Sequence, residues 1–258
     1  MKVYPQLDSI PRVAIALWML SVVGCAGVGD VLRGPRHPAE RMQANVFRAL
    51  NGISLPYRIY APSEKGSLPM LIYLHGLAGR GVDNRRQLDL AAQDLYDYAK
   101  ECGGLVLLVP QCPEGSMWGT DVLDSVVELS ERLAEEGIVD LRHLFVTGFS
   151  MGGMGCWNLA LRYPALLSGI MPVCAGPRRG SASDVPSTPK ELCEKRVLAV
   201  SYLDDPVVYP EYSGVLVGKL RKDGSKNARF RLEAKGGHTA CVYREKAELD
   251  WLIFGKEK

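Results

Sequence analysis

This sequence of 258 residues has few histidines, almost no net charge and only a short N-terminal apolar run. The apolar run covers residues 13–23, and these eleven residues are too few to cross a bilayer, which takes about 20. The formal net charge is +2 and no basic run with interleaved aromatic residues is present, so nucleic acid is not an expected partner. Only four histidines are present, which leaves few candidates for acid–base chemistry.

Residues 1–25 are predicted to be a targeting segment and not part of the fold. The apolar run ends in Val22-Val23-Gly24-Cys25, which resembles a bacterial lipobox, in which the cysteine is diacylated and becomes the new N-terminus. Ordinary secretory cleavage near residues 24–27 is the alternative. We therefore expect an exported protein whose only contact with a membrane is a lipid on Cys25, placed in the periplasm or at the cell surface, or otherwise a secreted protein. Residues 26–42 are expected to be a tether.

Six cysteines follow the targeting segment: Cys102, Cys112, Cys156, Cys174, Cys193 and Cys241. An even number in an exported protein permits disulfides, but the sequence does not separate the possible pairings. Cys102 and Cys112 bracket one extended segment and are therefore too far apart to pair with each other. Cys156 is interpreted as a small apolar residue on a helix.

The order of the expected elements predicts one α/β domain over residues 43–258. The pattern of residues 43–60 predicts a β-hairpin around Asn51-Gly52, a pair suited to a type I′ turn. Strands and helices then alternate without a linker or a composition shift, which predicts a doubly wound, mostly parallel sheet without a separate cap domain. The expected strands cover residues 69–74, 105–110, 144–147, 167–175, 196–203 and 228–234, and the expected helices cover 88–100, 121–136, the stretch after 151, 212–221 and 243–254.

The stretch 143–161 carries the strongest chemical signal in the chain. It reads as a buried strand, the turn Gly148-Phe149-Ser150-Met151-Gly152 and an apolar helix, which is the context of a nucleophile elbow. Gly148 and Gly152 are expected where strand and helix approach too closely for a side chain. A glycine-rich turn of a nucleotide-binding domain is the other interpretation, but the glycines do not follow G-x-G-x-x-G and no lysine follows as in a P-loop.

A serine nucleophile at an elbow needs a histidine and then an acid to orient it. His238 is the only histidine after Ser150, and it lies in a loop behind an expected strand. Asp204 and Asp205 both follow the strand 196–203, and the residues alone leave either of them as the acid. Two adjacent carboxylates cannot both face the imidazole, so the other is expected to be solvated or to cap the turn.

The oxyanion of a tetrahedral intermediate needs two N–H donors. The backbone of Met151, at the N-terminus of the helix after the elbow, is one candidate. The second is expected from the loop after strand 69–74, where Gly76-Leu77 allows the main chain to approach.

These motifs resemble one branch of the α/β-hydrolases, which comprises phospholipases, carboxylesterases and polyhydroxybutyrate-depolymerase-like enzymes and includes predicted peptidases of the prolyl-oligopeptidase type. The resemblance rests on residues 57–60, 74–84 and 110–113, the run Gly148 to Gly153 (GFSMGG), Asp205-Pro206-Val207-Val208, His238 and Asp250-Trp251-Leu252. It implies an α/β-hydrolase fold, an acid at Asp205, and oxyanion donors at the Leu77 and Met151 amides. It implies no metal and no organic cofactor.

Two positions depart from the pattern of that branch. Ser201-Tyr202 stands where the branch has His-Gly three residues ahead of the acid pair, which keeps Asp204 open as an alternative. Cys241 stands where an aromatic residue often follows the histidine, so the wall of the site near His238 is expected to differ.

The sequence therefore predicts a serine hydrolase that cleaves carboxylic esters through an acyl-enzyme intermediate. A small or polymeric ester is the expected partner, and neither its acyl group nor the oligomeric state can be read from the residues. Two alternatives stand beside it. One is a serine peptidase of the prolyl-oligopeptidase type, and the other is a surface binding lipoprotein without catalytic activity. Dienelactone hydrolases are a further relative, but they tend to have cysteine at the position of Ser150.

Overall fold

The computed structural model describes residues 38–62, 66–176 and 186–256. The predicted targeting segment, the predicted lipidation site Cys25 and most of the predicted tether lie outside these described residues. A 3-10 turn at Pro38–Arg41, within the predicted tether, packs on the domain. Ala39 and Met42 are buried, and the Ala39 N–H donates to Gln93 Oε1 at 3.1 Å.

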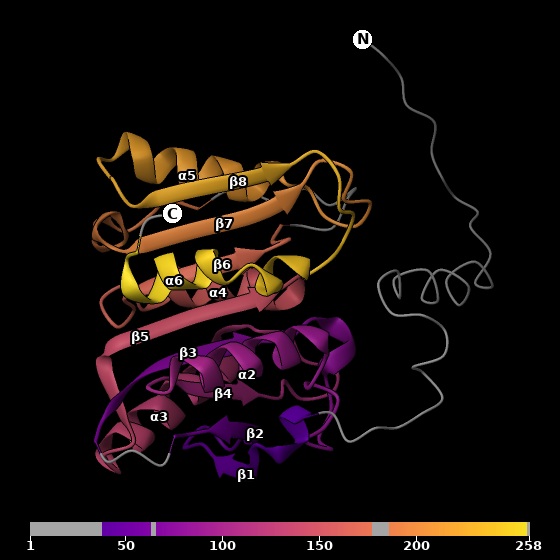
Figure 1. Cartoon of the computed structure of the whole chain (residues 1–258), viewed down its shortest axis with the longest axis vertical. Coiled ribbons are helices and arrows are strands. Elements are labelled where there is room, and N and C mark those ends of the chain that lie inside the picture. Colours follow the sequence, from indigo (N-terminus) through magenta and orange to yellow (C-terminus); the bar gives the residue numbers. More distant parts are fainter. Residues whose placement is uncertain (1–37, 63–65, 177–185, 257–258) are drawn as a thin grey trace, which may run out of the picture. The chain divides into compact units, whose positions relative to one another are not determined.

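The described residues form one eight-stranded sheet with the order β1-β2-β4-β3-β5-β6-β7-β8 (Figure 1). The pairs β1–β2 and β2–β4 are antiparallel, and the other neighbours are parallel. The predicted mostly parallel sheet with an antiparallel hairpin at its start is thus confirmed. The strands are β1 (Gln43–Arg48), β2 (Ser54–Tyr60), β3 (Leu68–Leu74), β4 (Val106–Pro110), β5 (Val139–Phe149), β6 (Gly169–Val173), β7 (Arg196–Tyr202) and β8 (Ala228–Glu233).

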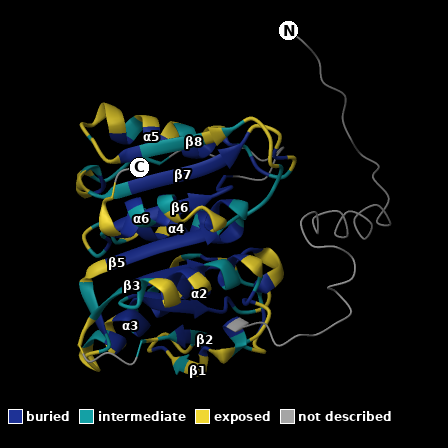
Figure 2. Ribbon diagram, viewed as in Figure 1, coloured by how far each residue is buried: buried dark blue, intermediate teal, exposed yellow. Residues whose placement is uncertain are grey.

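Helices cover both faces of the sheet, which is why the central strands are apolar throughout. The helices are α2 (Leu90–Cys102), α3 (Thr120–Glu135), α4 (Met151–Arg162), α5 (Glu211–Lys222) and α6 (Lys246–Phe254). Along β3, Met70 and Ile72 belong to the core on the side of α3, α4 and α5, while Leu71 and Tyr73 belong to the core on the side of α2 and α6. Figure 2 shows the same arrangement, with dark blue central strands and exposed residues on the outer helix surfaces. None of the helices among the described residues has the length and apolar character of a membrane-spanning segment.

The turn of the first hairpin differs from the predicted type I′ turn. A type I′ turn needs positive φ at both central residues, but only Gly52 has it, at 86°. The Gly52 N–H donates to Ala49 O, and the Ala49 N–H donates to Ile53 O, both at 2.9 Å, so the loop holds three residues. A three-residue loop of this kind needs only one residue in the left-handed region, here Gly52. The Asn51 side chain holds the hairpin against α3, because its Nδ2 donates to Asp121 O at 2.9 Å.

Two helix ends also differ from the sequence-based expectation. Helix α3 begins at Thr120, one residue before the expected start, behind Gly119, which supplies no side-chain cap. The last helix of residues 243–254 is divided into a 3-10 turn at Cys241–Arg244 and α6. Helix α2 ends at Gly103, which adopts the left-handed conformation with φ of 71°.

Candidate active site

Ser150 lies between the end of β5 and the start of α4, in the turn that the sequence singles out. Its backbone has φ 56° and ψ −113°, an unusual conformation for a residue with a side chain. The Ser150 N–H donates to Val173 O at 2.9 Å, which ties the turn to the neighbouring strand β6. This sharp, strained turn presents the hydroxyl at the carboxyl edge of the sheet.

Gly148 and Gly152 are packed too closely for any side chain. A Cβ atom at Gly152 would lie 1.7 Å from Leu74 O, and one at Gly148 would lie 2.5 Å from Gly152 O. Both obstacles are backbone atoms, so a rotamer change could not relieve them. The two glycines therefore allow α4 to start directly against β3 and β5.

Three polar side chains from separate parts of the chain meet at this turn. Ser150 Oγ lies 2.8 Å from His238 Nε2, and His238 Nδ1 lies 2.8 Å from Asp205 Oδ2. The His238 side chain is 10% exposed and the Asp205 side chain 1%. The Phe149 ring lies 4.8 Å from the imidazole, centroid to centroid, and covers one side of it. The hydroxyl, the imidazole and the carboxylate thus form one hydrogen-bonded chain that is mostly shielded from water.

Asp205 is held in its ionised form by its hydrogen-bond partners. Burial alone would raise its pKa, but the hydrogen bond to His238, the charge of that ring and the N–H groups of Val207 and Val208 outweigh it and lower the pKa. Those two N–H groups donate to Oδ1 at 2.8 and 3.1 Å. A carboxylate fixed in this way can hold the Nδ1–H tautomer of His238, which leaves Nε2 free to accept a proton.

Asp204 faces the backbone of the loop that carries His238, and not the ring. Its Oδ1 accepts the Gly237 N–H at 2.7 Å and its Oδ2 accepts the Gly236 N–H at 3.3 Å. Of the two aspartates that the residues alone left open, Asp205 is thus the one that contacts the imidazole.

The two candidate oxyanion donors lie at the start of helical turns on the same sheet edge. Met151 is the first residue of α4, and Leu77 is the first residue of the 3-10 turn Leu77–Gly79 after β3. The N–H of the first residue of a helix has no acceptor inside that helix. A Cβ atom at Gly76 would lie 3.3 Å from the Phe149 ring, so the Gly76 backbone lies beside the elbow.

His75 is completely buried beneath the loop that carries Leu77. Its Nε2 accepts the Cys112 N–H at 3.0 Å, so the proton must be on Nδ1, which donates to Gly76 O at 2.6 Å. The His75 carbonyl accepts Trp118 Nε1–H at 2.9 Å. Burial lowers the pKa of His75 from 6.5 to about 4 and keeps the ring neutral. The sequence alone did not indicate that His75 supports this loop.

We expect His75 to make the fold sensitive to acid. The pKa of His75 is lower in the folded than in the unfolded chain, so between about pH 6.5 and pH 4 only the unfolded chain binds this proton. The folded state therefore loses stability as the pH falls through this range. The shift corresponds to about 3 kcal/mol at pH 4. His75→Gln keeps an acceptor for the Cys112 N–H but does not titrate. The amount by which the wild type exceeds this variant in free energy of unfolding should therefore fall by about 3 kcal/mol between pH 7 and pH 4. Urea unfolding at both pH values measures it, and a constant difference would contradict the expectation.

Cys174 is the residue at this site that the sequence did not indicate. It follows β6 with φ of 47°, is buried, and its thiol donates to Thr239 O at 3.3 Å. Ligand-type atoms of Cys174, Asp205 and His238 lie within 4.8 Å of one another, the one such group of three among the described residues. Burial and the Asp205 charge raise the pKa of the thiol, so it keeps its proton and is a poor metal ligand. The sequence feature that could have indicated Cys174 is its position at the end of an expected strand, at the same edge of the sheet as Ser150.

All six cysteines of the domain are described, and each is a free thiol. The disulfides that an exported protein would permit are therefore not formed here.

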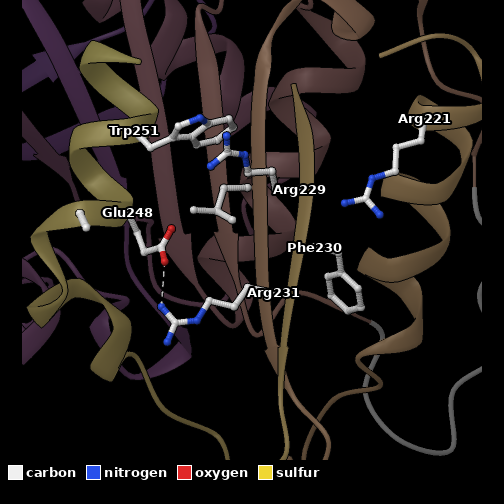
Figure 3. Close-up of a pocket in the computed structure, with 8 residues that line it drawn as sticks. Arg221, Arg229, Phe230, Arg231, Glu248 and Trp251 are labelled. Atoms are coloured by element: carbon white, nitrogen blue, oxygen red, sulfur yellow. Dashed lines mark hydrogen bonds and ion pairs between the residues drawn. The ribbon is translucent and has the colours of Figure 1, made fainter. Parts of the chain in front are cut away.

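Ion pairs join the segments that precede and follow the loop that carries His238. Arg231 on β8 contacts Glu245, which lies beyond the loop, at 2.6 Å. It also contacts Glu248 on α6 at 3.0 Å (Figure 3). They border a pocket of 470 Å³, lined by Leu198, Arg221, Arg229, Phe230, Arg231, Ala247, Glu248 and Trp251. Ser150, Asp205 and His238 do not line this pocket, so it is separate from the site at the elbow.

The comparisons with known proteins agree on the fold and on the kind of relative. The sequence matches no protein-family profile. It is 27% identical over 144 residues to the bifunctional acetylxylan esterase/xylanase XynS20E of Neocallimastix patriciarum, a match that covers 54% of this chain and 20% of that protein. Among solved structures, a thermostable esterase gives a TM-score of 0.73 at 27% identity, covering 84% of this chain and 63% of that one. A ferulic acid esterase gives a TM-score of 0.64 at 17% identity, covering 83% and 96%.

These similarities confirm two predictions: that the chain resembles hydrolases of the esterase type, and that it has the α/β-hydrolase fold. The chain spans about a fifth of the curated relative and less than two thirds of the thermostable esterase.

Proposed function

We propose that this α/β-hydrolase chain is a serine hydrolase that cleaves carboxylic esters through an acyl-enzyme intermediate. The observation that carries the proposal is the chain of two 2.8 Å contacts from Ser150 Oγ through His238 to Asp205 at a strained elbow. The similarity to a thermostable esterase and to an acetylxylan esterase supports an ester as the substrate.

The geometry supports the following steps. Ser150 Oγ attacks the ester carbonyl carbon while His238 Nε2 takes the hydroxyl proton, and Asp205 stabilises the resulting imidazolium. The carbonyl oxygen becomes an oxyanion that accepts the N–H groups of Leu77 and Met151, and the positive end of the α4 dipole favours this charge. The intermediate collapses, the C–O bond breaks, and His238 returns the proton to the leaving alcohol. Water, activated by the same imidazole, then releases the acid and restores Ser150.

A fluorophosphonate probe tests this proposal directly. We expect one phosphonyl group per chain, placed on Ser150 by peptide mass spectrometry, and competition by short-chain esters. Modification of another residue, or none, would overturn the assignment. An ester and an anilide with the same acyl group separate an esterase from a peptidase. An esterase should cleave only the ester efficiently, because the amine of an anilide is a poor leaving group that must be protonated before it departs.

We also propose export and lipid anchoring through Cys25, on the strength of the lipobox-like run at residues 22–25. Diacylation adds two acyl chains, which is enough for stable anchoring. In a bacterial host fed an alkyne-tagged fatty acid, the wild type should carry the tag in the membrane fraction and Cys25→Ala should not. Equal labelling of the two proteins would rule lipidation at Cys25 out.

A further inference from the structure

We propose that Asp204 is a positioning residue for His238: it holds the backbone of the loop that carries the imidazole, while Asp205 holds the ring. We call residues 234–240 the histidine loop. This inference rests on the proposed function, because it concerns how the base of that reaction is kept in place.

The two oxygens of the Asp204 carboxylate bind two successive N–H groups of the histidine loop. Oδ1 accepts from Gly237 at 2.7 Å and Oδ2 from Gly236 at 3.3 Å. These glycines directly precede His238 in the chain. Hydrogen bonds to an ionised acceptor are roughly twice as strong as neutral ones, so this contact restrains the loop next to the imidazole.

The backbone of the histidine loop can take this shape only with glycine. Gly236 has φ of 156° and Gly237 has φ of 65°, both in the region that residues with a side chain rarely adopt. A Cβ atom at Gly236 would lie 2.2 Å from the Tyr202 ring. Two adjacent glycines also make the free loop unusually mobile, so fixing His238 requires an anchor.

The end of β7 supplies this anchor together with the acid. Tyr202, the last residue of β7, packs under Gly236; Asp204 binds the loop backbone; and Asp205 binds the ring. Asp204 is exposed and Asp205 is buried, so the two neighbours point in different directions. One strand end therefore fixes both the position of the loop and the orientation of the imidazole. This explains why two adjacent aspartates are needed where the reaction uses one.

Loss of the Asp204 carboxylate should loosen the histidine loop without removing any reacting group. His238 Nε2 would then spend less time within reach of Ser150 Oγ, and small misplacements of a catalytic group cost up to about 100-fold in rate. Substrate binding does not use the loop anchor in this scheme. The effect is therefore expected in kcat, with KM within about twofold.

Asp204→Ala and Asp204→Asn test this inference on the full-length protein. We expect kcat for a short-chain p-nitrophenyl ester to fall about 10- to 100-fold in the alanine variant. In the asparagine variant part of kcat should return, because its Oδ1 can still accept from Gly237, although a neutral amide is a weaker acceptor than a carboxylate. Hydrogen–deuterium exchange should show faster exchange of the histidine-loop amides in Asp204→Ala, a readout that does not depend on activity.

Asp140→Ala is the matched control, because Asp140 also accepts a backbone N–H, that of Arg142 at 3.0 Å, near the other end of β5. It should leave kcat unchanged. A kcat within twofold of wild type in Asp204→Ala, or equal losses in the alanine and asparagine variants, would overturn the inference. A wild type without Ser150-dependent turnover would instead overturn the proposed function, so the two failures are distinguishable.

Discussion

Ser150→Ala is expected to lower kcat for a short-chain chromogenic ester by about 10⁴- to 10⁶-fold. The variant lacks the Oγ atom that lies 2.8 Å from His238 Nε2, so no acyl-enzyme can form. The N–H donors at Leu77 and Met151 remain, and they account for whatever residual rate persists. Burst and steady-state kinetics with p-nitrophenyl acetate measure the loss. The urea midpoint should stay close to that of the wild type, because the change removes one oxygen and fills no space.

Ser130→Ala provides the control for this loss. Ser130 is also buried, on α3, and its hydroxyl donates to Val126 O at 2.8 Å within the same helix. Its removal should leave turnover unchanged within twofold. If Ser150→Ala kept more than a few per cent of wild-type turnover, the nucleophile would have to be another residue.

Gly152→Ala is expected to have the largest effect on stability. The added methyl group would lie 1.7 Å from Leu74 O, and the next obstacles, Leu74 C and His75 O, are also backbone atoms. Either α4, which begins at the elbow, or β3, which pairs with the elbow strand β5, would have to move. We expect a loss of more than about 4 kcal/mol, enough to unfold a marginally stable domain. Soluble yield and urea unfolding measure the effect.

Gly218→Ala is the opposite case and the control. Gly218 is an exposed residue inside α5, and a Cβ atom there would meet nothing within 4 Å. Alanine is a better helix former than glycine, so this variant should be up to about 1 kcal/mol more stable. A folded, active Gly152→Ala protein of wild-type stability would show that the elbow can relax, contrary to the packing described above.

The features that could be predicted from the sequence depend on neighbouring residues or on the order of strands and helices. The elbow is readable because its strand, glycines and helix are contiguous, so their spacing fixes the geometry of Ser150. His238 followed from elimination, since no other histidine comes after Ser150. The parallel sheet followed from the alternation of apolar strands and helices, which leaves few possible topologies.

What the sequence left open depends on contacts between distant segments. The choice between Asp204 and Asp205 depends on which way each side chain leaves the end of β7, and that is set by the histidine loop some 30 residues later. The hairpin turn was predicted wrongly because the Asn-Gly preference is local, whereas Asn51 is bound to α3. The burial of Ala39 has no local signature, and the strand end at Cys174 does not show by itself that the thiol lies beside Asp205 and His238.

The three side chains that meet at the elbow come from distant parts of the chain, and this has a consequence for folding. The hydroxyl comes after β5, the carboxylate after β7 and the imidazole after β8, so no smaller part of the sheet holds all three. Trp118 and Trp157 lie in the interior that α3 and α4 share, and contacts closer in sequence form earlier than distant ones. During refolding from urea, the fluorescence of Trp118 and Trp157 should therefore recover before turnover, whereas that of Trp251 on α6, whose ring packs with Arg229 of β8, should recover with it.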